Sequence, residues 1–177
     1  MKRFLRNGSF IMVFVLTVFT FSACSQESSA QQVKVYNNDI VQIQKDMFSK
    51  AQDASAVFKQ QNLDPQKVLS TLQSIQSQIN ASHDKFKGMS VPGGAEQLSD
   101  AMERFFQIEI NGIQKIIAGV QQIQGHQSDS VMMKNFSDTF SQFSLQENTA
   151  LKDFYSTQQM VAQQFGQKVV QTNQNQN

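Results

Sequence analysis

The stretch LSDAMERFFQIEINGIQKIIAGV, residues 98–120, decides the fold of this 177-residue chain. Its apolar residues recur every three or four positions, the spacing that places side chains on one face of an α-helix. A second group of apolar residues widens this face, as expected for a well-buried helix. The spacing predicts a long helix over about residues 95–124. Its main face carries Leu98, Ala101, Phe105, Ile108, Gly112, Ile116, Gly119 and Ile123, flanked by Met102, Phe106, Ile113, Ile117 and Val120.

Three more segments have the same period and predict helices over about 37–61, 65–87 and 128–165. Short connections join the four segments, so neighbouring helices must run antiparallel. The sequence therefore predicts an all-α fold, a single antiparallel up-down-up-down four-helix bundle over residues 36–166. The expected core positions are Ile40, Ile43, Met47, Ala51, Ala54 and Phe58; Val68, Leu72, Ile75, Ile79, Ser82 and Phe86; and Met133, Phe136, Phe140, Phe143, Ala150, Phe154 and Val161, with Glu147 and Thr157 interrupting the last series.

Gly112 and Gly119 lie seven residues apart on the most apolar helix. Alanine is the better helix former by up to about 1 kcal/mol per site, so a physical reason for glycine is needed. Either a neighbouring helix approaches too closely for a methyl group, or the space is left open for a ligand. Both readings remain open at the level of the sequence.

The first 24 residues have the pattern of a bacterial export signal. Lys2, Arg3 and Arg6 precede the uncharged run FIMVFVLTVFTF (10–21). A membrane-spanning helix needs about 20 apolar residues, so the run is short for an anchor and suits a signal peptide. The pattern FSAC (21–24) that ends it resembles the lipobox of bacterial lipoproteins, with Phe21 in place of the usual Leu.

The lipobox resemblance implies that the thiol of Cys24 receives a diacylglyceryl group and that a peptidase cuts before it. The alternative is a plain signal peptide or a short anchor with an incidental cysteine. The resulting expectation is a cleaved signal peptide over 1–23, a flexible tether over 24–35 and a disordered polar tail over 167–177. The polar tether sequence SQESSAQQ (25–32) would reach about 16 Å and hold the domain near the bilayer.

The charge of the chain narrows its possible partners, and its cysteine content excludes an internal disulfide. Removal of the leader takes away three basic side chains and leaves 12 basic against 14 acidic ones. Without a basic cluster, no nucleic-acid partner is expected. Cys24 is the only cysteine, so no intramolecular disulfide can form and the fold depends on its core.

Three stretches carry a second resemblance: YNNDIVQIQKDM (36–47), FKGMSVPGG (86–94) and LSDAMERFFQIEI (98–110). They resemble the leptospira-type helical surface lipoprotein family of unknown function. The resemblance covers roughly residues 36–160 and implies a lipobox-bearing protein with a helical domain. It brings no catalytic residues.

The sequence predicts no catalytic residues, no metal site and no resident cofactor. The histidines are His83 and His126, and no Glu-x-x-His pair of a di-iron bundle is present. A haem pocket would draw its ligands from these histidines and from Met47, Met102, Met133 or Met160, although methionines on an apolar helix face usually belong to the core. Glu109 lies beside the apolar stripe and reads either as a solvated flank or as a functional carboxylate.

Together these features predict a lipid-anchored, non-catalytic lipoprotein of the bacterial envelope. Its expected partners are membrane lipid through acylated Cys24 and a protein of unknown identity. Ser25 directly after Cys24 favours the outer membrane or cell surface over the inner membrane. The alternative is a carrier of a small ligand or haem, with a pocket beside Gly112 and Gly119.

Overall fold

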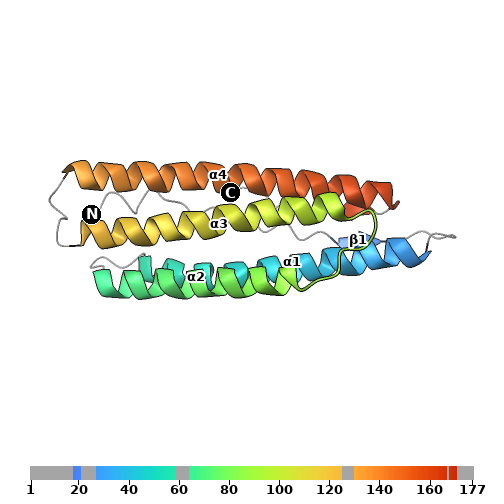
Figure 1. Cartoon of the computed structure of the whole chain (residues 1–177), viewed down its shortest axis with the longest axis horizontal. Helices are drawn as coiled ribbons and strands as arrows, with labels where there is room; N and C mark the ends of the chain where they lie inside the picture. Colours follow the sequence, from blue (N-terminus) through green and yellow to red (C-terminus); the bar gives the residue numbers. More distant parts are fainter. Residues whose placement is uncertain (1–17, 21–26, 59–63, 125–129, 167, 171–177) are drawn as a thin grey trace.

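The computed structural model describes residues 18–20, 27–58, 64–124, 130–166 and 168–170. Within these ranges the chain forms helices α1 (Glu27–Phe58), α2 (Pro65–Lys87), α3 (Glu96–Ile123) and α4 (Ser130–Gln164). The helices alternate in direction along one long axis (Figure 1). The predicted up-down-up-down four-helix bundle is therefore confirmed. We call one end of the bundle the near end; it contains the start of α1, the α2–α3 loop and the end of α4. The opposite end, which contains the start of α4 and the end of α3, is called the far end.

Local sequence signals set the ends of α2 and α3. The Asp64 side chain accepts a hydrogen bond from the backbone N–H of Gln66 at 2.9 Å, and Pro65 is the first helical residue. These are the residues expected at an N-cap and at the first helical position, where proline loses no hydrogen bond. In the loop that follows α2, the N–H of Gly94 donates to the Glu96 carboxylate at 2.9 Å. Gly94 has a φ of 89°, a conformation that favours glycine.

Helix α1 begins earlier than the sequence suggested, and the flexible tether expected over 24–35 is wrong from residue 27 onwards. The helix starts at Glu27, and its first turns already bury Val33 and Tyr36 in the core. Ala30, Gln31 and Gln32 are good helix formers, so an established helix extends through them at little cost. Residues 24–26 lie outside the described part of the chain.

Two short strands accompany the bundle. Strand β1 (Val18–Thr20) pairs antiparallel with β2 (Lys168–Val170), with Val18 opposite Val170. The disordered tail predicted for 167–177 is therefore wrong at residues 168–170. Residues 167 and 171–177, and most of the predicted signal peptide, lie outside the described residues.

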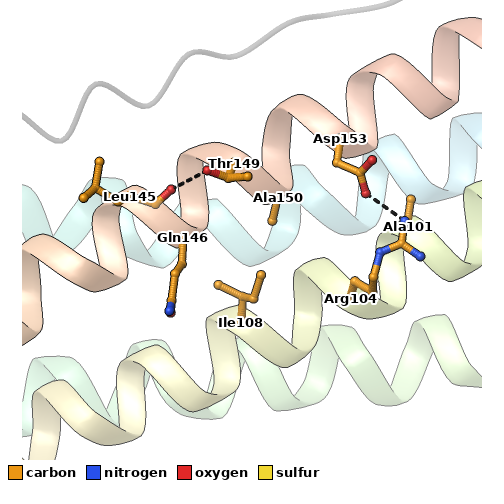
Figure 2. A pocket seen from close by; sticks show the side chains of 8 residues that line it. All are labelled: Ala101, Arg104, Ile108, Leu145, Gln146, Thr149, Ala150 and Asp153. Atoms are coloured by element: carbon orange, nitrogen blue, oxygen red, sulfur yellow. Dashed lines mark hydrogen bonds and ion pairs between the residues drawn. The ribbon is translucent and has the colours of Figure 1, made fainter.

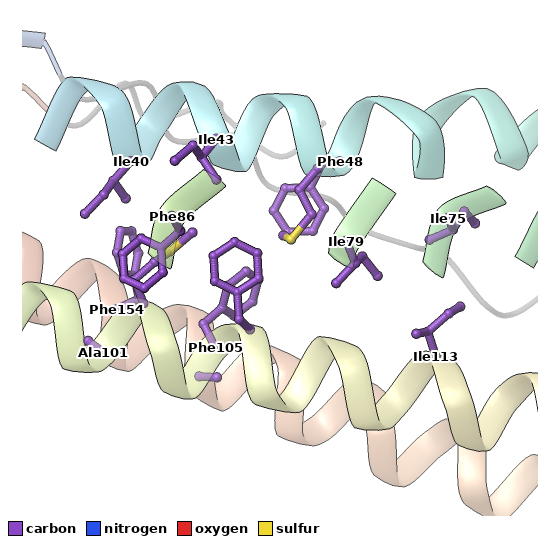
Figure 3. Packing of buried hydrophobic residues seen from close by; sticks show 14 of the residues in the cluster. Ile40, Ile43, Phe48, Ile75, Ile79, Phe86, Ala101, Phe105, Ile113 and Phe154 are labelled. Carbon is purple, nitrogen blue, oxygen red and sulfur yellow. The ribbon is translucent and has the colours of Figure 1, made fainter. Parts of the chain in front are cut away.

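The core lies between the α1–α2 pair and the α3–α4 pair (Figure 3). Phe105 of α3 is fully buried, and its ring centroid lies 5.9 Å from that of Phe48 on α1. Phe86 of α2 contacts Phe106 at 5.5 Å in the same way. Most predicted core positions are buried; Val68, Ile108, Met133, Phe136 and Phe140 are half-buried, and the side chains of Ala51, Ala54 and Phe58 lie outside the described set.

We expect Phe105→Ala to lower the free energy of unfolding by about 3–5 kcal/mol, the usual cost of truncating a buried phenylalanine. The measurement is urea unfolding followed by circular dichroism. Gln114→Ala, an exposed change on the same helix, serves as the control and should have little effect. A loss below about 1 kcal/mol at Phe105 would contradict the core assignment.

Candidate functional site

The predicted site residues separate into two groups. Cys24 and His126 lie outside the described residues. Gly112 and Gly119 lie on α3 and face α4, where each is covered by a phenylalanine ring. The α3–α4 contact therefore contains both of the predicted glycine positions.

Gly112 forms a notch that the Phe143 ring fills. A Cβ atom added at Gly112 would overlap two ring carbons of Phe143 and lie 2.9 Å from a third. Phe143 is buried, so its ring has no free space to enter. Close packing is thus the reason for this glycine, but the neighbour is an aromatic side chain and not the helix backbone that the sequence suggested.

Gly119 repeats the arrangement one heptad further along α3. A Cβ atom there would lie 2.6 Å from a ring carbon of Phe136, which precedes Phe143 by one heptad on α4. The two contacts therefore share one antiparallel register. The ligand pocket considered beside Gly112 and Gly119 is wrong, because both spaces are filled by rings.

Near the Gly112 notch, one carboxyl group is buried and a second is half-buried. Glu109 on α3 is only 5% exposed, and its Oε1 atom has no hydrogen-bond partner. The α3–α4 register places Glu147 of α4 at the same level, and it interacts electrostatically with Glu109. The reading of Glu109 as a solvated flank is wrong, because its side chain is buried.

Burial gives both carboxyl groups unusual protonation. Burial raises the pKa of Glu109 well above its ordinary value, and the neighbouring Glu147 charge raises it further. Burial also raises the pKa of Glu147, to about 7. Removal of a charge from water favours its neutral form, and two like charges at close range cannot both ionise easily. The pair is therefore largely protonated below neutral pH.

Three ion pairs of the described residues involve carboxyl groups other than those of Glu109 and Glu147. Lys85 pairs with Asp46 at 3.5 Å, Arg104 with Asp153 at 2.7 Å, and Lys134 with Asp138 at 2.6 Å. Only Glu147 is identified as a charge acting on Glu109. A neutral carboxylic acid is thus the form of Glu109 that suits this interior.

The His83 side chain contacts residues of α3 and does not pair with the adjacent Asp84 in these contacts. Its Nε2 atom lies 2.8 Å from Oε2 of Glu103, and its ring centroid lies 4.9 Å from that of Phe106. Burial acts to raise the pKa of Glu103, but hydrogen bonds from Gln107 and His83 and nearby positive charges lower it overall. The contact links α2 to α3 at the edge of the core.

A buried amide pair joins α1 to α4. The Gln158 side chain donates from Nε2 to Oδ1 of Asn37 at 2.6 Å, and both residues are 2% exposed. The Asn37 Nδ2 and Gln44 Nε2 atoms are buried without a hydrogen-bond partner. Sequence reasoning missed this pair. Asn37 and Gln44 are polar residues seven positions apart on the apolar face of α1, and this spacing was a signal that could have found it.

The outer side of the α3–α4 contact has an open groove of about 490 Å³ (Figure 2). Ile108 and the exposed Leu145 supply apolar lining, while the Arg104–Asp153 ion pair lies at one end. The small side chains of Ala101 and Ala150 also line the groove.

The metal and haem ligands considered from the sequence can be located where they fall within the described residues. Within them, no three His, Cys, Asp or Glu side chains gather as a metal site would require. Met47 and Met102 are buried among apolar core residues, Met133 is half-buried and Met160 is exposed. None of the helices in the described part of the chain is both long and apolar enough to cross a membrane.

Comparison of the chain with known protein families, curated proteins and solved structures finds no match. The resemblance to helical surface lipoproteins therefore stays a prediction.

Gly112→Ala should lower the free energy of unfolding by about 1–3 kcal/mol, because the added methyl group displaces a buried ring. Gly119→Ala should cost less, since Phe136 is half-buried and its ring can move outward. Urea unfolding of both variants gives the comparison. Replacement of Phe143 by Leu should reduce the effect of Gly112→Ala, which a double-mutant cycle measures. Stabilisation by Gly112→Ala would contradict tight packing.

The carboxyl pair predicts that stability falls as pH rises. The folded state raises both pKa values, so it holds protons that the unfolded chain releases. The stabilisation is complete below the ordinary value of 4.5 and is lost as pH rises through about 7. Urea unfolding should show a loss on the order of 1–3 kcal/mol across this range.

Glu109→Gln and Glu147→Gln should each flatten this pH dependence, because an amide cannot ionise. The exposed Asp39→Asn is the matched control and should leave it unchanged. An unaltered pH profile in both glutamine variants would rule out the pair as its source.

Proposed function

We propose that this protein is a lipid-anchored, non-catalytic helical lipoprotein of the bacterial envelope that serves as an interaction or structural module. The observation that carries the proposal is FSAC (21–24) directly after a basic start and an uncharged apolar run. A thiol is needed at this position because sulfur is a far better nucleophile than a hydroxyl oxygen toward the lipid donor. The resemblance of residues 36–160 to helical surface lipoproteins belongs to the same proposal.

Acylation of Cys24 would anchor the domain without a spanning helix. Each buried methylene contributes roughly 0.8 kcal/mol, so two or three acyl chains hold a protein stably where one does not. Cleavage before Cys24 would also remove β1, because Val18–Thr20 belongs to the leader. We favour the outer membrane or cell surface over the inner membrane, on the basis of Ser25 after Cys24.

A non-catalytic role is supported by the position of the acidic groups. General acid–base catalysis requires a carboxyl group within hydrogen-bond reach of its substrate. Glu109 has the altered pKa of such a group, but it is closed off inside the bundle beside the Phe143 ring. The carrier alternative loses its main support for the same reason, since rings fill the spaces at both glycines.

Cys24→Ala should abolish incorporation of labelled palmitate in cells and leave an uncleaved precursor, because no thiol remains to be alkylated. Autoradiography and the mass of the purified protein measure the two effects. The matched control is Ser25→Ala, which keeps the thiol and should still incorporate label. Normal labelling and maturation of the Cys24→Ala protein would rule out the lipoprotein assignment.

A further inference from the structure

The near end of the bundle brings together three parts of the chain that are distant in sequence. The start of α1, the loop between α2 and α3, and the end of α4 lie at this end (Figure 1). Helix α3 has 28 residues, so the far end is about 40 Å away at 1.5 Å per residue. If one end touches a surface, the other end lies about 40 Å from it, and a distance-sensitive measurement can tell the two ends apart.

The early start of α1 limits how far this end can be from Cys24. Only Ser25 and Gln26 separate Cys24 from the first helical residue, Glu27. Three Cα–Cα steps span at most about 11 Å even when the chain is fully extended. A lipid-bearing Cys24 would thus keep the start of α1 within that distance of the bilayer surface.

The loop at the same end is suited to contact with lipid. Residues 88–95, GMSVPGGA, carry no charged side chain. Val91 is 44% exposed, and Met160 near the end of α4 is also exposed. Lys85 and Lys87 lie in the last turn of α2, just before the loop. An uncharged loop can enter the headgroup region without the cost of desolvating a charge.

We propose that the bundle stands end-on on the membrane, with the loop 88–95 in contact with the phospholipid headgroups of the bilayer that holds the Cys24 acyl chains. This inference rests on the proposed lipidation and adds an orientation and a contact surface to it. A flat orientation on the α3–α4 groove would press the Arg104–Asp153 ion pair against the lipid, which carries a desolvation cost that the loop avoids.

The single cysteine of the chain makes this orientation measurable. In the lipidated protein the Cys24 sulfur is a thioether and does not react with a maleimide, so an added cysteine is the sole labelling site. We would place it at three exposed apolar positions along the bundle: Val91 in the loop, Leu145 midway along α4, and Val131 at the far end. Their exposed fractions are 44%, 69% and 65%.

Each full-length variant is purified in its lipidated form, labelled with a fluorescent maleimide and reconstituted into vesicles of phosphatidylethanolamine and phosphatidylglycerol. A fraction of the lipid carries a nitroxide quencher on its headgroup. The Val91→Cys label should lose most of its fluorescence on addition of the quencher lipid. The Leu145→Cys and Val131→Cys labels should keep nearly all of theirs.

The possible outcomes separate the two proposals. If the purified protein carries no acyl chains by mass, the lipidation fails and the orientation fails with it. If the protein is acylated and vesicle-bound but the Val91→Cys label is not quenched, only the end-on contact is wrong. Quenching of Leu145→Cys or Val131→Cys equal to that of Val91→Cys would show a flat orientation and overturn the inference.

Discussion

The Phe143 ring packed against Gly112 is the contact on which the α3–α4 half of the bundle depends. Because glycine has no side chain, the ring packs directly on the α3 backbone, and the two helices can approach more closely than they could with a larger residue at position 112. It also fixes their register, because Gly119 and Phe136 repeat the contact one heptad away. With this register set, Arg104 reaches Asp153 and Glu109 lies level with Glu147. The surface ion pair and the pairing of buried Glu109 with half-buried Glu147 are thus consistent with one register.

The interior of the bundle contains several polar side chains as well as apolar ones. A buried polar atom without a hydrogen-bond partner costs free energy, and Oε1 of Glu109 is such an atom. The Asn37–Gln158 hydrogen bond joins α1 to α4 and would be lost in another register. Buried polar contacts of this kind select one alignment among several apolar ones. The bundle therefore combines apolar packing, which is compatible with several helix alignments, with a few polar contacts that form in only one alignment.

The regular parts of the fold could be predicted from the sequence because they follow from periodicity. The stripe from Leu98 to Ile123 and the Asp64-Pro65 cap are local patterns, and the structure has both. Residues 27–35 were misread because their surface is polar while Val33 already contributes to the core. The partners of Gly112, Glu109 and His83 could not be predicted, because they come from helices 20 or more residues away. Glu147 was visible only as an interruption of the α4 stripe.

The equal heptad spacing of the two glycine–phenylalanine contacts has a consequence for how the α3–α4 hairpin folds. If α4 slid by one heptad, about 10.5 Å along α3, one phenylalanine would still meet a glycine while the other lost its notch. Such a misaligned hairpin would keep only half of the native contact. Only the native alignment places both rings on glycines, so the two contacts together distinguish it from its neighbours. The equal spacing of the two contacts makes this slide possible, and the loss of one contact makes the slid alignment less stable than the native one.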